Sequence, residues 1–112
     1  MNNTSFNRIR QFTNKQAGIL EEKITENSSI ENDLGIYGDE AVEFIIAFGK
    51  EFNVDVSKFM AAEYFSAEGD TILPGIIRLF TGKKKPKQKD LTIKHLMKSI
   101  TAGRLDEEVI KN

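Results

Sequence analysis

The 112-residue chain contains no cysteine, no tryptophan, one histidine and two prolines. Without cysteine it can form no disulfide, no thiolate zinc site and no iron–sulfur cluster, and it has no cysteine nucleophile. A single histidine argues against a His-based metal centre or catalytic triad. The N-terminus lacks the apolar stretch of a signal peptide, and no apolar run is long enough to span a membrane. We therefore expect a soluble cytoplasmic protein.

The remaining composition is typical of one globular domain. Hydrophobic residues make up 39% and charged residues 29% of the chain, with eight phenylalanines, and this length supports a single core over residues 1–112. Charge is distributed unevenly. Residues 1–70 carry 6 basic and 13 acidic side chains, a balance of −7, whereas residues 71–112 carry 10 and 4, a balance of +6. We expect surfaces of opposite charge, each able to face its own partner.

The N-terminal half is predicted to contain two helices. The spacing of Phe6, Ile9 and Phe12 predicts a helix over residues 5–17 that ends at Gly18. A polar connection over residues 21–38 follows, and its spaced aliphatic residues predict a loop held against the core. They are Ile24, Ile30, Leu34 and Ile36.

The segment 39–52 is the strongest predicted helix. Its acidic start suits the positive end of a helix dipole, and its apolar arc is wider than the usual single stripe. The arc is extended sideways by Val42 and Ile46. Two interpretations stay open: this edge is core, or it is left exposed for a partner.

The C-terminal half is predicted to be mainly helical too. We expect a short helix over residues 59–65 that presents four side chains to the core, and a helix over 74–81. An exposed linker is expected over Lys83–Lys89, followed by a last helix over 92–102 that is capped by Thr92 and stopped by Gly103. The four side chains are Phe59, Met60, Tyr64 and Phe65. His95 is predicted at the surface of the last helix. Any strands are expected only within residues 54–75.

The order of these segments resembles the acyl carrier protein family. The residues that carry the resemblance are ITENSSIENDLG at 24–35, EAVEFI at 40–45, the Glu-Phe pair at 51–52 and a final helix that opens with Thr-Ile at 92–93. The resemblance covers residues 9–56 and 91–103. It implies a four-helix bundle of the acyl-carrier type, with an insertion over residues 57–90 before the last helix.

The chemical motif of that family is absent. Carrier proteins attach 4′-phosphopantetheine to a serine at the N-terminus of the second helix, where the helix end favours a phosphate group. In this register the serine position is Gly38, which has no hydroxyl, and Asp39 would repel a phosphate. The string DLGIYGD at 33–39 is more similar to a group of small bacterial carrier-like proteins of unknown function. We therefore expect no phosphopantetheine and no other cofactor.

The resemblance also implies which residues would meet a partner. In carrier proteins, partner proteins bind to the second helix. The matching positions here are Asp39, Val42, Glu43 and Ile46. The alternative is that the two aliphatic residues pack under residues 57–90, with Glu43 simply solvated.

We predict a non-enzymatic interaction domain that binds a protein partner through its second helix. No nucleophile–base pair, metal-ligand set or paired acids stand out in the sequence, so neither catalysis nor a metal site is expected. Two alternatives stay open. One is a true acyl carrier with an atypical attachment site. The other is association with nucleic acid or an anionic membrane through Lys83–Lys89, although no aromatic residue interleaves these lysines.

Overall fold

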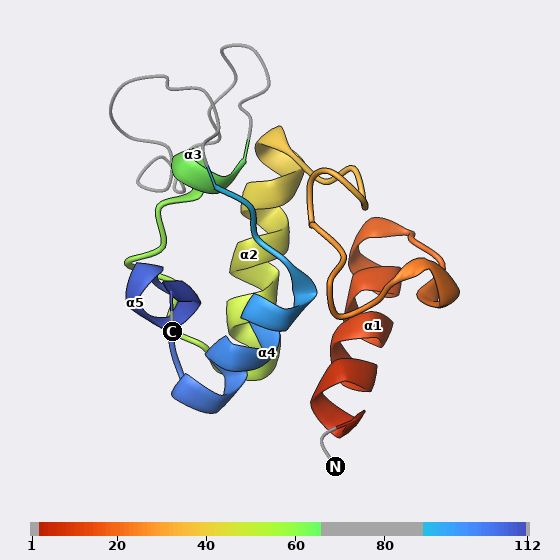
Figure 1. Ribbon diagram of the computed structural model, residues 1–112, viewed down its shortest axis with the longest axis horizontal. Helices are drawn as coiled ribbons and strands as arrows, with labels where there is room; N and C mark the ends of the chain where they lie inside the picture. Colours follow the sequence, from red (N-terminus) through yellow and green to blue (C-terminus); the bar gives the residue numbers. More distant parts are fainter. Residues whose placement is uncertain (1–2, 66–88, 112) are drawn as a thin grey trace.

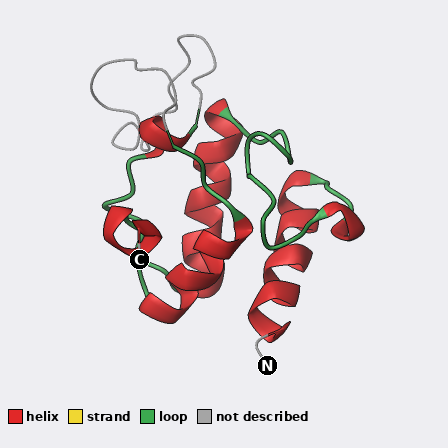
Figure 2. Cartoon of the chain, viewed as in Figure 1, coloured by secondary structure: helices red, strands yellow, loops and turns green. Residues whose placement is uncertain are grey.

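The chain is mainly helical in the computed structural model, which describes residues 3–65 and 89–111 (Figure 1). Within these two stretches there is no strand, only two isolated bridges (Figure 2). The helices, including the single-turn 3₁₀ helix η1, are α1 (Asn3–Ala17), η1 (Glu21–Lys23), α2 (Gly38–Phe52), α3 (Ala61–Tyr64), α4 (Ile93–Ala102) and α5 (Glu107–Lys111). The expected mainly helical fold is thus confirmed.

The core is centred on α2, which Figure 1 shows between α1 and the C-terminal helices. Its buried face carries Phe44, Phe48 and Phe52, and Phe12 of α1 packs against all three, with ring centroids 5.2, 6.1 and 5.7 Å away. Such tilted and edge-on pairs are the favoured aromatic geometries. Helix α4 packs against both α1 and α5, and Ile9 of α1 is fully buried. The wide apolar arc predicted for residues 39–52 therefore fits a helix that forms the centre of the core.

The helix ends lie close to where the sequence predicts them. Gly18 and Gly103 follow α1 and α4 with positive φ angles of 73° and 81°, a conformation that costs glycine no Cβ clash. Thr92 caps α4 as predicted, and its hydroxyl accepts a hydrogen bond from the backbone N–H of His95. His95 completes a capping box, because its Nδ1 accepts from the Thr92 N–H at 3.0 Å. The prediction of a simple surface histidine is wrong: His95 is half-buried.

The long connection between α1 and α2 is held against the core, as expected. Ile24, Ile30 and Ile36 are buried. Its backbone also pairs with the approach to α4: Ile30 N–H donates to Leu91 at 2.8 Å, Ile93 N–H to Ser28 at 3.1 Å and Lys94 N–H to Glu26 at 2.9 Å. Backbone pairing with residues far away in the sequence thus also holds the loop in place. The apolar pattern alone does not reveal this pairing.

The segment after α2 departs from its prediction in two respects. The helix is shorter than residues 59–65, and Met60 is 44% exposed although Phe59, Tyr64 and Phe65 are buried as predicted. Met60 directly precedes the helix and has non-helical backbone angles, so the helical periodicity used to place it does not apply there. Residues 54–65, part of the range to which any strands were confined, form no strand, and Asp55 makes only a parallel bridge with Arg104. The predicted helix over 74–81 and residues 83–88 of the predicted linker lie outside the described residues.

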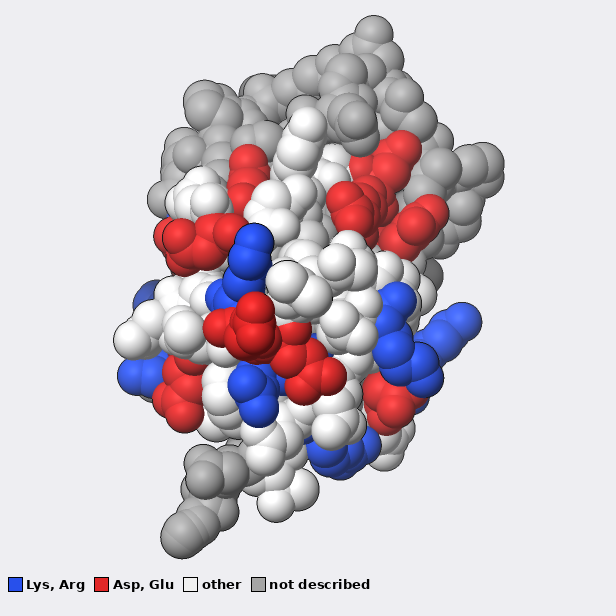
Figure 3. Space-filling model, turned by 90° about the vertical axis from the view of Figure 1, so that its right-hand side faces the viewer, with Lys and Arg blue, Asp and Glu red and all other residues white. Residues whose placement is uncertain are grey.

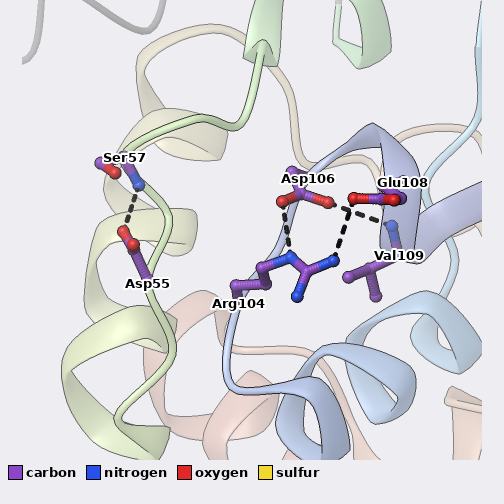
Figure 4. A network of polar contacts seen from close by, with 6 residues as sticks. All are labelled: Asp55, Ser57, Arg104, Asp106, Glu108 and Val109. Atoms are coloured by element: carbon purple, nitrogen blue, oxygen red, sulfur yellow. Dashed lines mark hydrogen bonds and ion pairs between the residues drawn. The ribbon is translucent and has the colours of Figure 1, made fainter.

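Helix α5 was not expected from the sequence. Its first turn is capped by Asp106, whose carboxylate accepts a hydrogen bond from the Val109 N–H at 3.0 Å. Arg104 bonds the same carboxylate at 2.9 Å and also reaches Glu108 (Figure 4). Across from this group, Asp55 accepts from the Ser57 N–H at 2.9 Å. Lys89, the described end of the basic stretch, forms an ion pair with Glu107 at 2.9 Å.

None of the helices formed by the described residues has the length and hydropathy needed to cross a bilayer.

Candidate functional site

The start of α2 is the place where the resemblance puts a carrier's attachment serine. Tyr37 precedes the helix in extended conformation, with φ −154° and ψ 175°, and no side chain caps the helix. Gly38 opens the helix with a φ of +63° and is buried. This left-handed conformation costs a residue with a Cβ about 1 kcal/mol or more. Gly38 therefore supplies a backbone conformation that a residue with a side chain adopts only with strain.

The loop before this helix is fixed by hydrogen bonds centred on Ser29. Its N–H donates to the Asp33 carboxylate at 2.7 Å, and its hydroxyl donates to Asp90 at 2.9 Å. The same hydroxyl accepts from the Asn32 N–H at 3.0 Å, and the Asn32 amide group also reaches Asp90 at 3.1 Å. Because Asp90 lies directly before the backbone pairing at residues 91–94, the loop is anchored at both the side-chain and the backbone level. The loop that leads to Tyr37 is therefore held in place.

The serines nearest to this site are engaged in the loop itself. Ser28 and Ser29 are only 6% and 4% exposed. The Ser28 hydroxyl accepts from the Thr25 N–H at 2.9 Å, and the Ser29 hydroxyl is bound to Asp90 as described. Ser57 is exposed, but it lies beyond α2 and begins no helix. These positions lack the exposed hydroxyl at a helix N-terminus that the carrier chemistry uses.

Three of the four predicted partner-binding residues lie along one accessible edge of α2. Asp39, Glu43 and Ile46 recur at i, i+4 and i+7 and so share one side of the helix; Glu43 is exposed and the other two are partly exposed. Val42 differs, because it is 0% exposed. The alternative interpretation as a core residue therefore holds for Val42, which we leave out of the candidate surface. Ile46 also packs partly against the core.

Tyr37 directly precedes this helix. It is 45% exposed, one of the three exposed large hydrophobic side chains among the described residues. We call Tyr37, Asp39, Glu43 and Ile46 together the α2 surface. The sequence analysis missed Tyr37. A signal was present: in extended backbone, neighbouring side chains point to opposite sides, so a buried Ile36 predicts an outward Tyr37.

Charge around the start of α2 is acidic. Asp39 and Glu40 occupy the first turn, where negative charge is favoured by the helix dipole. In Figure 3, acidic side chains lie in the upper part of the described surface, and acidic and basic side chains are mixed in its middle and lower part. The described residues of the first turn of α2 thus present negative charge.

The arrangement is suited to binding. Among the described residues, no three histidine or acidic side chains lie close enough to hold a metal ion. His95 has a lowered pKa, chiefly because burial disfavours its charged form and secondly because Lys98 lies near. Its Nδ1 accepts the hydrogen bond that caps α4, which indicates that His95 has a structural role. The α2 surface offers an aromatic side chain, an aliphatic side chain and carboxylates.

Residues 4–106 match the model of a family described as a protein of unknown function, DUF1493. No solved structure matches the chain.

Proposed function

Since the chain belongs to the DUF1493 family, whose description assigns no function, we propose a function from the site itself: a non-enzymatic, carrier-like interaction domain that binds a partner protein through the α2 surface. The finer fold assignment, an acyl-carrier-type bundle, is part of this proposal and rests on the resemblance of residues 9–56 and 91–103. We propose that the domain works without a cofactor and inside the cell.

The observation that carries the proposal is the exposed Tyr37 at the start of α2. Aromatic side chains are enriched at protein interfaces, where they bury a large area at a small entropic cost. Tyr37 is 45% exposed, stands on a loop fixed by Ser29 and Asp90, and is flanked by the carboxylate of Asp39. A rigid aromatic residue with charged neighbours is typical of a contact that energetically dominates an interface.

The test is a comparison of variants in partner capture from the native host. Tyr37→Ala and Ile46→Asp should each abolish capture of a protein that the wild type retains. Leu20→Ala is the matched control, since Leu20 is 54% exposed but lies far from α2 in the sequence, and it should leave capture unchanged. Circular dichroism of each variant checks the fold. Equal capture by wild type and both α2 variants would contradict the proposal.

Val42→Asp separates the surface from the core. A carboxylate at a fully buried position without a partner is strongly destabilising, so this variant should lose its helical signal, whereas Ile46→Asp should keep it.

The alternative of an atypical acyl carrier is tested by intact mass. The protein purified from its host, and again after treatment with a broad-specificity phosphopantetheinyl transferase and coenzyme A, should show the unmodified mass. An adduct would support carrier chemistry instead, and peptide mapping would identify the serine that carries it.

A further inference from the structure

A groove lies between α1 and the C-terminal half of α2. It has a volume of about 550 Å³. Phe12, Ala47 and Phe52 contribute its apolar side chains, Arg8 and Lys15 line it from α1, and Lys50 lines it from α2, together with Glu51 and two glutamines. The floor of the groove is therefore apolar, and basic side chains line it on both the α1 side and the α2 side.

The floor of the groove is formed by two aromatic rings that pack together. Phe12 and Phe52 contact each other edge-on, with centroids 5.7 Å apart. The Arg8 guanidinium lies 4.7 Å from the centroid of the Phe52 ring, which is the distance of a cation–π contact. One cation is thus held over the apolar floor, and the shape of the groove does not depend on a loop.

The cations of the groove have no acidic partner among the described residues. Arg8, Lys15 and Lys50 form no ion pair with any described residue, and the single acid of the groove is Glu51. The groove thus carries three positive charges and one negative charge beside its apolar side chains. This charge balance favours an anionic occupant. This is the opposite of the preference at the start of α2.

The spacing of the cations indicates the form of that occupant. Arg8 and Lys15 are seven residues apart, which is two helical turns or about 10.5 Å along α1. A helix that lies in the groove would present carboxylates at the same spacing, with apolar residues between them to meet Phe12. We infer that this groove receives an acidic, amphipathic helix of a partner protein, in the helix-in-groove mode of recognition.

Other occupants fit the groove less well. A membrane surface is broad, whereas the apolar side chains here are recessed: Phe12 is half-buried and Phe52 is only 9% exposed. Bases of a single strand need exposed aromatic faces for stacking, which buried rings do not provide. An acidic helix uses both features of the groove, its charge and its apolar floor.

This inference is independent of the proposed function. The α2 surface consists of Tyr37, Asp39, Glu43 and Ile46, whereas α2 lines the groove with Ala47, Lys50, Glu51 and Phe52, so the two sites share no residue.

The test measures binding of synthetic peptides to the full chain by fluorescence anisotropy. The probe is a helical peptide with a leucine stripe flanked by glutamates at i and i+7, and the comparison is the same peptide with glutamine at each glutamate position. We expect the acidic peptide to bind and the neutral peptide to bind at least about tenfold more weakly. Added salt should weaken the acidic peptide's binding.

Matched charge variants locate the site. Lys15→Gln combined with Lys50→Gln should weaken the acidic peptide about tenfold; neither lysine makes a packing contact like that of Arg8, so the fold should persist. Lys23→Gln combined with Lys111→Gln makes the same change of charge outside the groove and should have little effect. Tyr37→Ala should leave peptide binding unchanged, which distinguishes this result from the test of the proposed function. Equal weakening by both double variants, no binding, or binding of anionic vesicles in place of the peptide would overturn the inference.

Discussion

His95 shows how one residue couples helix capping to protonation. Its Nδ1 accepts a hydrogen bond from the Thr92 N–H, which requires that nitrogen to be unprotonated. Burial and Lys98 lower the pKa of His95, Asp90 opposes this and Lys94 adds to it. A proton on the ring would convert the acceptor of the capping box into a donor and release the first turn of α4.

We predict that His95 makes the fold less stable in mild acid. Because its pKa is lower in the folded than in the unfolded state, its contribution is complete above the unfolded pKa of about 6.5 and is lost as pH falls through the folded pKa. Urea unfolding across this range measures the effect. His95→Gln keeps a capping box that does not titrate and should flatten this part of the profile. His95→Ala should cost about 1 kcal/mol at neutral pH. An unchanged acid slope in both variants would contradict this role.

Gly38 is a second residue whose backbone conformation bears on function, because it occupies the position of the carrier serine in the resemblance. We predict that Gly38→Ser, which restores the hydroxyl found in carrier proteins, destabilises the fold by at least about 1 kcal/mol, because φ is +63° at a buried position. Gly38→Ala is the matched control, since it adds the same Cβ and should cost a similar amount in urea unfolding. A serine variant as stable as the wild type would show that the start of α2 relaxes easily.

At the scale of elements, helix α5 depends on its N-terminal cap, because it is too short to be stable by itself. It has five residues, too few to be stable alone. Asp106 caps it, and the hydrogen bond from Val109 is the main reason that the pKa of Asp106 is lowered. The helix brings Val109 into a buried position.

We predict that Asp106→Ala lowers stability by about 1 kcal/mol, and that Asp106→Asn, which can still cap, loses less. Amide exchange at Val109 and Ile110 should accelerate in the alanine variant. Because the pKa of Asp106 is lowered in the folded state, its contribution is present above the unfolded value and disappears as pH falls through the folded one. Identical exchange in the alanine variant and the wild type would show that packing alone holds α5.

The predictable elements were those with both a periodic apolar face and a terminal signal. Helices α1 and α4 have apolar stripes and ends marked by Gly18, Thr92 and Gly103, and α2 has an apolar arc and an acidic first turn, so local chemistry was enough to place them. Helix α5 was missed because five residues show no clear period, although Asp106 followed by two glutamates is a legible start signal.

The candidate site was harder to predict than the helices. Helix α2 begins at Gly38, one residue before its predicted start. Whether Val42 is surface or core depends on what packs against that edge, which no local pattern encodes. The exposure of Tyr37 likewise depends on a loop anchored by Asp90, more than fifty residues later in the sequence.

At the scale of the whole molecule, residues 24–30 and 91–94 form one structural unit. We predict that the amides of Ile30, Ile93 and Lys94, all donors across this contact, exchange only through global unfolding, whereas the α5 amides exchange through local opening. Native-state hydrogen exchange at increasing denaturant measures this. Separate opening energies for Ile30 and Ile93 would show that the loop and α4 detach without unfolding the rest.

The pairing of this loop with the approach to α4 also has a consequence for synthesis. Translation releases the N-terminal residues first, and α1 and α2 can begin to associate through Phe12 while the chain is still growing. The loop between them still lacks its long-range partners at that stage, because the groups from Asp90 to Lys94 are synthesised later. Until then Ser28, Ser29 and the unpaired amides of the loop are open to solvent and to folding factors. The nascent protein therefore acquires its helical centre before the end of α2 that carries Tyr37 is fixed in place.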